Sequence, residues 1–269
     1  MQIDDMSEVK KEMQQPAQSA GTGLQPGERL DEIGFGGMTL IQKPEEFCYG
    51  VDAVILADFA AKYARRSFKS AVDLGTGTGI IPLVLSHKTA IPAITGIEVQ
   101  KDSYDRAVRN TKNNGLEGRV GFIHGDVKDF RTGWGRQLQG SCDLVTSNPP
   151  YTAGSSGLTS SNPAKLIARH ETTATLDDFM KCAAYILRDK GDFFMVHRPS
   201  RIVDICCLGR QYGLEVKELQ FVSPNRESKP NILLVHMVKG GGRETKLLPP
   251  LYVYDMEGNY TPQLLEAYR

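Results

Sequence analysis

Residues 70–79 read Ser70-Ala-Val-Asp73-Leu-Gly75-Thr-Gly77-Thr-Gly79, a short apolar run followed by alternating glycines. The apolar run predicts a buried β-strand over 70–74, and the residues after the glycines predict a helix over 80–86. Glycines at a strand-to-helix turn let a ligand approach the backbone, and the start of a helix offers unpaired N–H groups. The spacing does not match GxGxxG, because Ile80 stands at the sixth position, and no lysine follows as in a P-loop. The stretch therefore predicts a ligand-binding turn of another class.

Short apolar runs and helical stretches alternate on the C-terminal side of this turn. Further strands are predicted over 93–97, 120–123, 142–145 and 192–196, and helices over 102–114 and 175–188. Such an α/β pattern forms a mainly parallel sheet with helices on both faces, and its ligands bind beyond the carboxyl ends of the strands. Two β-rich runs, 214–222 and 232–238, predict the antiparallel C-terminal edge of a seven-stranded sheet, and 249–254 predicts a short terminal strand or extended segment.

The chain before residue 67 differs in composition from the rest. Residues 1–27 mix Gln, Ser, Gly, Pro and charged residues with almost no apolar periodicity, which is typical of a disordered arm. Residues 28–66 predict a small hairpin and then an amphipathic helix, capped by Asp52, that continues to about Ala64. We therefore divide the chain into an arm (1–27), a hairpin-and-helix extension (28–66) and a main domain (67–269).

The composition excludes several classes of protein. The chain has 269 residues, 24% of them charged, and no window approaches the roughly 18 uncharged apolar residues of a membrane-spanning helix. Five cysteines without a CxxC pair argue against a disulfide framework and a zinc site. The first residues lack the basic and apolar regions of a secretory signal, which predicts a cytoplasmic protein. Basic and acidic residues balance at 32 each, although basic residues are in excess between Lys181 and Lys246. The composition does not indicate an oligomeric state.

The segment Ser147-Asn148-Pro149-Pro150-Tyr151 directly follows the predicted strand over 142–145. Two prolines remove two N–H donors and stiffen the chain, so the outward-facing groups are acceptors, the Asn148 side-chain oxygen and the Pro149 carbonyl. A planar amine conjugated to a ring or a carbonyl is a poor nucleophile because its lone pair is delocalised. Two acceptors that hold its N–H bonds favour the geometry in which the lone pair faces an electrophilic methyl group. Tyr151 offers a flat face for a planar substrate.

From Asp73 onward these motifs resemble those of the Rossmann-like class I methyltransferases that use S-adenosylmethionine. In that superfamily an acid precedes a GxGxG loop, an acid at the end of the second strand accepts from the ribose, and an acid after the third strand accepts from the adenine amine. The resemblance implies S-adenosylmethionine as the cofactor and no metal. It assigns cofactor binding to Asp73, Gly75, Thr76, Gly77, Gly79, Glu98, Val99, Asp126, Val127 and Asn148. It assigns catalysis to Asn148, Pro149, Pro150 and Tyr151, the NPPY signature of methyltransferases that act on the adenine amine or on protein glutamine.

The flanking segments are similar to those of the bacterial methyltransferases that modify adenine N6 at position 37 of valine tRNA. The similarity covers roughly residues 28–260, including the segment around Asp52, Val196-His-Arg-Pro199 and Pro249-Pro-Leu-Tyr-Val-Tyr254. It implies a tRNA partner whose target base is already unpaired and turns into the site at low cost. The candidate substrate-binding residues are Tyr151, Arg169, His170, Arg198, Arg201 and Lys229, with Arg226 as a further phosphate contact.

Two alternative functions stay open. Release-factor glutamine methyltransferases share the NPPY signature, but they usually carry a separate helical N-terminal domain, whereas a hairpin and one helix are predicted here. A protein that binds the cofactor without catalysis, such as an RNA chaperone or a regulatory subunit, is disfavoured by the intact signature. Three other residues have structural interpretations: Trp134 is more readily a loop anchor than a base-stacking residue, and Cys206 and Cys207 are predicted to be core thiols. The polar loop 152–164 is predicted either to close over RNA or to form a long crossover.

Overall fold

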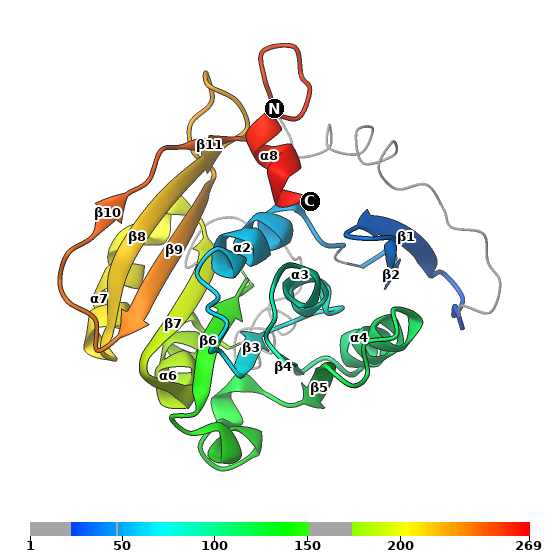
Figure 1. Ribbon diagram of the computed structural model, residues 1–269, viewed down its shortest axis with the longest axis horizontal. Coiled ribbons are helices and arrows are strands. Elements are labelled where there is room, and N and C mark those ends of the chain that lie inside the picture. Colours follow the sequence, from blue (N-terminus) through cyan, green and yellow to red (C-terminus); the bar gives the residue numbers. More distant parts are fainter. Residues whose placement is uncertain (1–22, 47, 151–173) are drawn as a thin grey trace, which may run out of the picture.

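The computed structural model describes residues 23–46, 48–150 and 174–269, and its central feature is a sheet covered by helices on both faces (Figure 1). Its main strands are β3 (Ser70–Leu74), β4 (Ala93–Glu98), β5 (Val120–His124), β6 (Cys142–Ser147), β7 (Leu187–His197), β8 (Leu214–Ser223) and β9 (Ile232–Lys239). They are hydrogen-bonded in the order β8-β9-β7-β6-β3-β4-β5. β9 runs antiparallel to β7 and β8, and the pairs from β7 to β5 are parallel. This confirms the predicted parallel sheet with an antiparallel C-terminal edge.

The sheet has nine strands in the described part of the chain instead of the predicted seven. The additional strands are β10 (Lys246–Leu247) and β11 (Leu251–Tyr252), and both pair in parallel with β8. Two residues are too few to produce a recognisable apolar alternation, so β10 was not predicted. β11 lies inside the segment 249–254, which was predicted to be a strand or extended.

Two hydrophobic cores lie on opposite faces of the sheet. In the described part of the chain the α-helices are α2 (Val51–Ala61), α3 (Ile80–Lys88), α4 (Lys101–Asn113), α6 (Leu176–Ile186), α7 (Ile202–Gln211) and α8 (Pro262–Ala267), and the short 3-10 helices are η2 (Val127–Asp129), η3 (Trp134–Leu138) and η4 (Pro199–Arg201). Alternate residues of β7 point to the two faces, as a strand requires. Phe194 and Val196 pack in the core that contains α2, α3 and α8, whereas Phe193 and Met195 pack in the core that contains α6.

The predicted hairpin and the helix after it are present, with differences in detail. β1 (Arg29–Gly34) and β2 (Met38–Gln42) pair as a separate antiparallel sheet. Gly50 occupies the N-cap of α2, so the prediction that Asp52 caps this helix is wrong; Asp52 lies in the first turn. The helix is also not amphipathic, because it lies between the sheet, α3 and α8 and is buried on nearly every side. The carboxylate of Asp52 instead contacts the side chain of Asn148.

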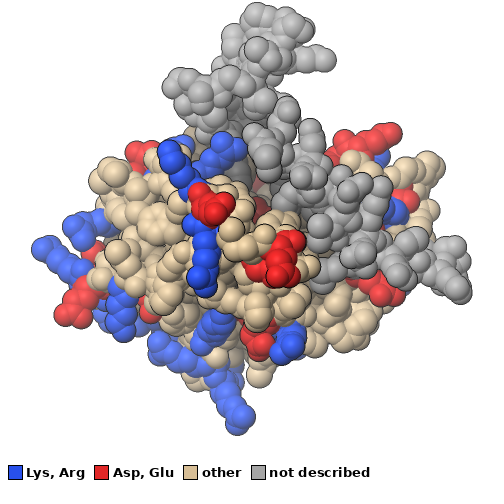
Figure 2. Space-filling view, turned by 90° about the horizontal axis from the view of Figure 1, so that it is seen from above, with Lys and Arg blue, Asp and Glu red and all other residues tan. Residues whose placement is uncertain are grey.

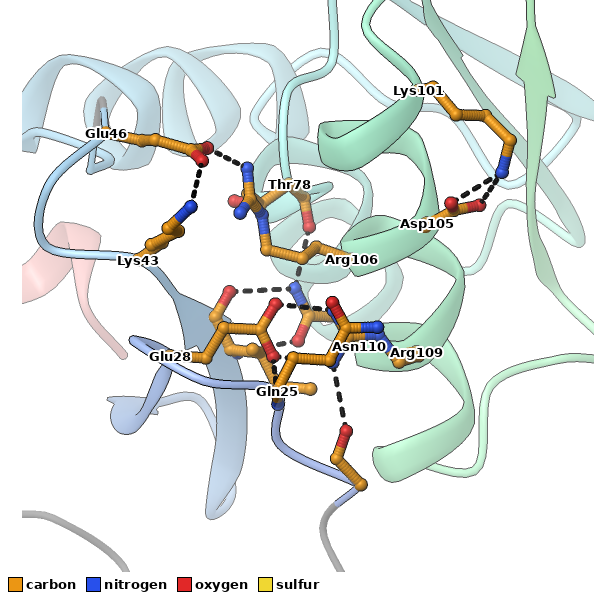
Figure 3. A network of polar contacts seen from close by, with 12 residues as sticks. Gln25, Glu28, Lys43, Glu46, Thr78, Lys101, Asp105, Arg106, Arg109 and Asn110 are labelled. Carbon is orange, nitrogen blue, oxygen red and sulfur yellow. Dashed lines mark hydrogen bonds and ion pairs between the residues drawn. The ribbon is translucent and has the colours of Figure 1, made fainter.

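The hairpin is attached to α4 by a network of polar contacts (Figure 3). The amide of Asn110 accepts from the N–H of Ile41 in β2, at 2.6 Å, and donates to the carbonyl of Thr78 in the glycine turn, at 2.9 Å. Asn114, one helical turn further on, accepts from and donates to the backbone of Thr39. Arg109 forms a two-point ion pair with Glu28, which holds the end of the predicted arm in a turn. The network thereby connects the N-terminal hairpin to the glycine turn.

The start of the predicted arm, residues 1–22, lies outside the described residues. None of the helices that the structure describes is both long and apolar enough to cross a membrane. The division of the chain at residues 27 and 66 remains a prediction, and α2 shares one core with the sheet.

Candidate active site

The carboxyl ends of four parallel strands meet at one edge of the sheet, and each predicted motif follows one of them. Leu74 at the end of β3 is in register with Ile97 of β4 and with Ser147 at the end of β6, and Glu98 is in register with His124 at the end of β5. The glycine turn, Glu98, the Asp126 loop and Asn148 are therefore neighbours. This is the edge at which ligands bind in open α/β sheets.

The glycine turn is fixed by hydrogen bonds to β4. The backbone N–H groups of Gly75 and Thr76 both donate to the carbonyl of Ile97, at 3.0 Å. Glu98, which is 5% exposed, accepts from the N–H of Gly77 through one carboxylate oxygen and from the N–H of Gln100 through the other, each at 2.8 Å. The acid predicted to hold a ribose therefore also holds the turn in shape.

Asp73 precedes this turn and is fully buried. Thr146 donates to its Oδ1 at 2.7 Å, while Oδ2 is buried and accepts no hydrogen bond of standard geometry from the described residues, although the Thr76 side chain is near enough to offset part of the effect of burial on the pKa of Asp73. Burial raises the pKa of Asp73 to about 7, and the negative charge of Glu98 adds to the increase. A buried acceptor without a donor at the mouth of a binding turn is suited to a ligand that carries N–H groups, such as the ammonium of an amino-acid moiety.

The raised pKa of Asp73 predicts that the ligand-free protein becomes less stable as the pH rises. Below about pH 4 this carboxyl is protonated in both the folded and the unfolded chain. As the pH rises from about 4 to about 7, only the unfolded chain loses the proton, so the contribution to the free energy of unfolding falls by about 4 kcal/mol. Urea unfolding of the native protein and of Asp73→Asn at pH 5 and pH 8 measures this. The native protein should lose stability relative to the variant; a constant difference would exclude the raised pKa.

Gly77 provides the space that a ligand needs above the turn. Its φ is +59°, and a Cβ added there meets nothing within 4 Å. Gly79 differs, because at φ +88° an added Cβ would lie 2.7 Å from the ring of Phe122, so its glycine is required by packing. A cofactor that combines a nucleoside with an amino acid fits this turn. The turn offers open space at Gly77, the buried Oδ2 of Asp73 and the N–H groups at the start of α3. Bound there, S-adenosylmethionine would supply a reactive methyl group.

Gly77→Ala should weaken cofactor binding by about tenfold or more, because the new methyl group fills the open space and the backbone at positive φ is strained. Gly115→Ala is a matched control, since Gly115 has φ +65°, equally open surroundings and a position at the far end of α4. Both variants should lose similar stability, about 1 kcal/mol. Isothermal titration with S-adenosylmethionine separates them. Equal affinities in the two variants would show that the turn does not contact the cofactor.

The loop after β5 brings Asp126 and Val127 to the same edge. Asp126 begins η2 and accepts from the N–H of Lys128 at 2.9 Å, and Val127 is buried. The indole of Trp134 donates to the carbonyl of Asp126 at 2.8 Å and leaves no room for a side chain at Gly125. Trp134 is therefore an anchor of this loop, as predicted. Val99 is 53% exposed at the end of β4, open to a ligand.

The proline corner begins where β6 ends. Ser147 is buried and its hydroxyl donates to the carbonyl of Leu74, which joins the corner to β3. Pro149 is buried and Pro150 is exposed. The side-chain amide of Asn148 donates to Oδ2 of Asp52 at 3.1 Å, across 96 positions of sequence. Tyr151 lies outside the described residues.

The predicted phosphate contacts come together at the same edge, although they are distant in sequence. Arg198 follows β7, and Arg226 and Lys229 lie in the connection between β8 and β9, whose ends are close to that of β7 through the pairs His197–Leu233 and Val222–Ile232. Arg201 forms an ion pair with Asp204 at 2.6 Å.

Seen from above, Lys and Arg side chains gather mainly on the side where β8 and β10 lie, with acidic side chains among them (Figure 2). Lys229 and Arg198 are exposed. Arg169, His170 and the loop 152–164 lie outside the described residues.

The sequence did not identify three residues near the site. Asp52 was interpreted as a helix cap, yet it contacts Asn148. The ring of Phe179 in α6 packs on the glycine turn, 3.3 Å from the position that a Cβ at Gly75 would occupy. The apolar pattern of α6 does not distinguish this residue from the other core residues of the helix. His197, at the end of β7, is buried beside two arginines, and burial together with the charges of Arg201 and Arg198 lowers its pKa to about 4.

The prediction that Cys207 is a core thiol is wrong, because it lies on the face of α7 that is exposed to solvent. Cys206 is half-buried and packs against the core that contains α6, which agrees in part with the prediction. In the described ranges no group of three or more His, Cys, Asp or Glu side chains is arranged to hold a metal ion.

Curated relatives share most of the chain. The tRNA1(Val) (adenine(37)-N6)-methyltransferase of Pedobacter heparinus is 25% identical over 210 residues, which are 78% of this chain and 84% of the relative. The protein of the same name from Actinobacillus pleuropneumoniae is 30% identical over 208 residues, 76% of this chain and 83% of the relative.

Solved structures share the fold. A predicted O-methyltransferase of Agrobacterium tumefaciens superimposes with a TM-score of 0.63 at 18% identity, over 81% of this chain and 95% of that one. TYW2 of M. jannaschii, solved in complex with AdoMet, gives a TM-score of 0.53 at 13% identity, over 80% and 86% of the two chains. The Rossmann-like methyltransferase fold predicted from the sequence is thus confirmed.

The family model described as the methyltransferase small domain matches residues 39–204, a range that runs from the hairpin through the glycine turn and the proline corner to α7. The chain belongs to the methyltransferase small domain family.

Proposed function

We propose that this protein transfers a methyl group from S-adenosylmethionine to the exocyclic N6 amine of adenine 37 in valine tRNA. The observation that carries the proposal is the position of Asn148, held at the end of β6 beside the glycine turn of β3. This position supports the inference that the Asn148 oxygen and the Pro149 carbonyl form an acceptor pair for a planar amine next to the methyl donor. The relatives from Pedobacter heparinus and Actinobacillus pleuropneumoniae, whose alignments with this chain cover 84% and 83% of their own lengths, are both named for this activity.

The chain's own groups account for the chemistry without a general base. When bound, S-adenosylmethionine supplies a methyl group on a positively charged sulfur. We assign Asp73 and the turn from Gly75 to Gly79 to the amino-acid end of the cofactor, Glu98 to its ribose, and Asp126 with Val127 and Val99 to its adenine. The Asn148 oxygen and the Pro149 carbonyl hold the two N–H bonds of the target amine, so that its lone pair faces the methyl carbon. With the cofactor bound, the amine nitrogen would form the new N–C bond as the S–C bond breaks, and it would then release one proton to water.

The substrate is held by the proline corner and by a basic rim. Tyr151 follows the corner and is proposed to stack on the flipped base. Arg198, Lys229 and Arg226 lie at the same edge of the sheet and are proposed to contact phosphates, with Arg201, Arg169 and His170 as further contacts. A tRNA substrate also agrees with the cytoplasmic location predicted from the sequence, which remains a prediction.

The test uses unmodified transcripts of valine tRNA with labelled S-adenosylmethionine. The expected product is N6-methyladenosine at position 37, identified by nuclease digestion and mass spectrometry, and a transcript with guanosine at position 37 should receive no label. Methylation of a protein glutamine with no label on any tRNA would instead support the alternative that this protein is a glutamine methyltransferase. Cofactor binding without transfer to either substrate would support a non-catalytic protein.

A further inference from the structure

The N-terminal helix α2 contributes a carboxylate to the proline corner. Asp52 and Asn148 are 96 residues apart, and the Nδ2 group of Asn148 donates to Oδ2 of Asp52 at 3.1 Å. Both side chains are half-buried. We propose that Asp52 is a positioning residue for methyl transfer, which selects the orientation of the Asn148 amide; this inference rests on the function proposed above.

The selection follows from the chemistry of the two groups. An ionised carboxylate only accepts hydrogen bonds, whereas an asparagine amide donates through nitrogen and accepts through oxygen. Asp52 therefore binds only the nitrogen end of Asn148, and the amide oxygen is directed away from Asp52. A reversed amide would present N–H groups to an amine that itself needs acceptors. The negative charge of Asp52 also polarises the amide and strengthens its oxygen as an acceptor.

The carboxylate is itself held in place by its surroundings. Its other oxygen, Oδ1, accepts from the N–H of Ala53 at 3.0 Å. A Cβ added at Gly50 would lie only 2.5 Å from this oxygen, so the glycine leaves the space that the carboxylate occupies. Burial raises the pKa of the Tyr268 phenol at the end of α8, and the charge of Asp52 adds to the increase after the contributions of Tyr49 and Tyr260.

Asp52→Asn is the direct test, because it keeps the shape of the side chain but lets it face either end of the Asn148 amide. We expect kcat to fall about 10- to 100-fold, as for a small misplacement of a reacting group. The KM for tRNA, the Kd for S-adenosylmethionine and the melting temperature should stay near those of the native protein.

Gly50→Ala perturbs the same contact without changing Asp52, since φ at Gly50 is −107° and alanine fits this backbone. It should lower kcat by a smaller factor.

Two further variants show whether Asp52 acts through Asn148. In the double variant Asp52→Asn with Asn148→Ala, activity should equal that of Asn148→Ala alone, because the group that Asp52 orients is missing. Asp102→Asn removes an acid from the first turn of α4 at an exposed position and should leave kcat unchanged.

The measurements distinguish this proposal from its competitors. A raised Kd for S-adenosylmethionine with unchanged kcat at saturation would make Asp52 a cofactor ligand and overturn the proposal. A lower melting temperature in Asp52→Asn, with kcat unaffected in Gly50→Ala, would make its role structural and likewise overturn it. If the native protein methylates protein glutamine instead of tRNA, the proposed function fails, while the variants still test Asp52 on that amide substrate.

Discussion

Asn148→Ala is expected to lower kcat for tRNA methylation by about 10²- to 10³-fold, the effect of removing one group that stabilises a transition state in a preorganised site. The alanine removes the acceptor that holds one N–H of the target amine, and it leaves Asp52 without the amide that it contacts. Single-turnover assays with labelled cofactor and saturating transcript measure the chemical step. The melting temperature should change little, because Asn148 is only half-buried.

A matched control separates catalysis from folding. Asn113→Ala makes the same chemical change at the exposed end of α4, which lies at the opposite edge of the sheet. Its kcat should equal that of the native protein. If Asn148→Ala retained more than about a tenth of the native kcat, the proline corner could not be the group that aligns the amine, and the proposed mechanism would fail.

The sequence was sufficient to predict the order of the elements and the side of the sheet that carries the site. Apolar runs of four to six residues separated by helical stretches specify a parallel sheet, and a parallel sheet brings all its carboxyl ends to one edge. The motifs around Asp73, Glu98, Asp126 and Asn148 therefore had to converge, and the register of β3, β4, β5 and β6 confirms it. Local pattern and topology are enough for such residues.

Contacts between distant segments could not be predicted in this way. Asp52 at the start of a helix has the local signature of a cap, and only the packing of α2 against the end of β6 directs it to Asn148 instead. Asn110 and Asn114 likewise look like ordinary helical residues, yet their amides hold the backbone of β2. Helical periodicity shows which face a residue occupies, and it does not show which segment covers that face.

The largest effect on stability is expected at a buried polar network that spans three strands and is separate from the active site. His236 of β9 donates to Asp192 of β7, with Nε2 and Oδ1 2.8 Å apart, and its other ring nitrogen lies 3.5 Å from Glu218 of β8. Tyr63 donates to the same carboxylate of Glu218. Asp192 is 2% and His236 is 5% exposed, and the imidazole stacks on Phe194 with ring centres 4.4 Å apart.

His236→Leu should lower the free energy of unfolding by about 3–5 kcal/mol, because it leaves the carboxylate of Asp192 buried without a donor. Oδ2 of Asp192 already accepts no hydrogen bond from the described residues, so the remaining oxygen has no substitute. The double variant Asp192→Leu with His236→Leu removes both polar partners, and it should be more stable than His236→Leu alone. Urea unfolding of the native protein, the two single variants His236→Leu and Asp192→Leu, and the double variant gives the comparison. A double variant that loses the sum of two large single losses would show that packing of the ring, and not the buried charge, dominates at this position.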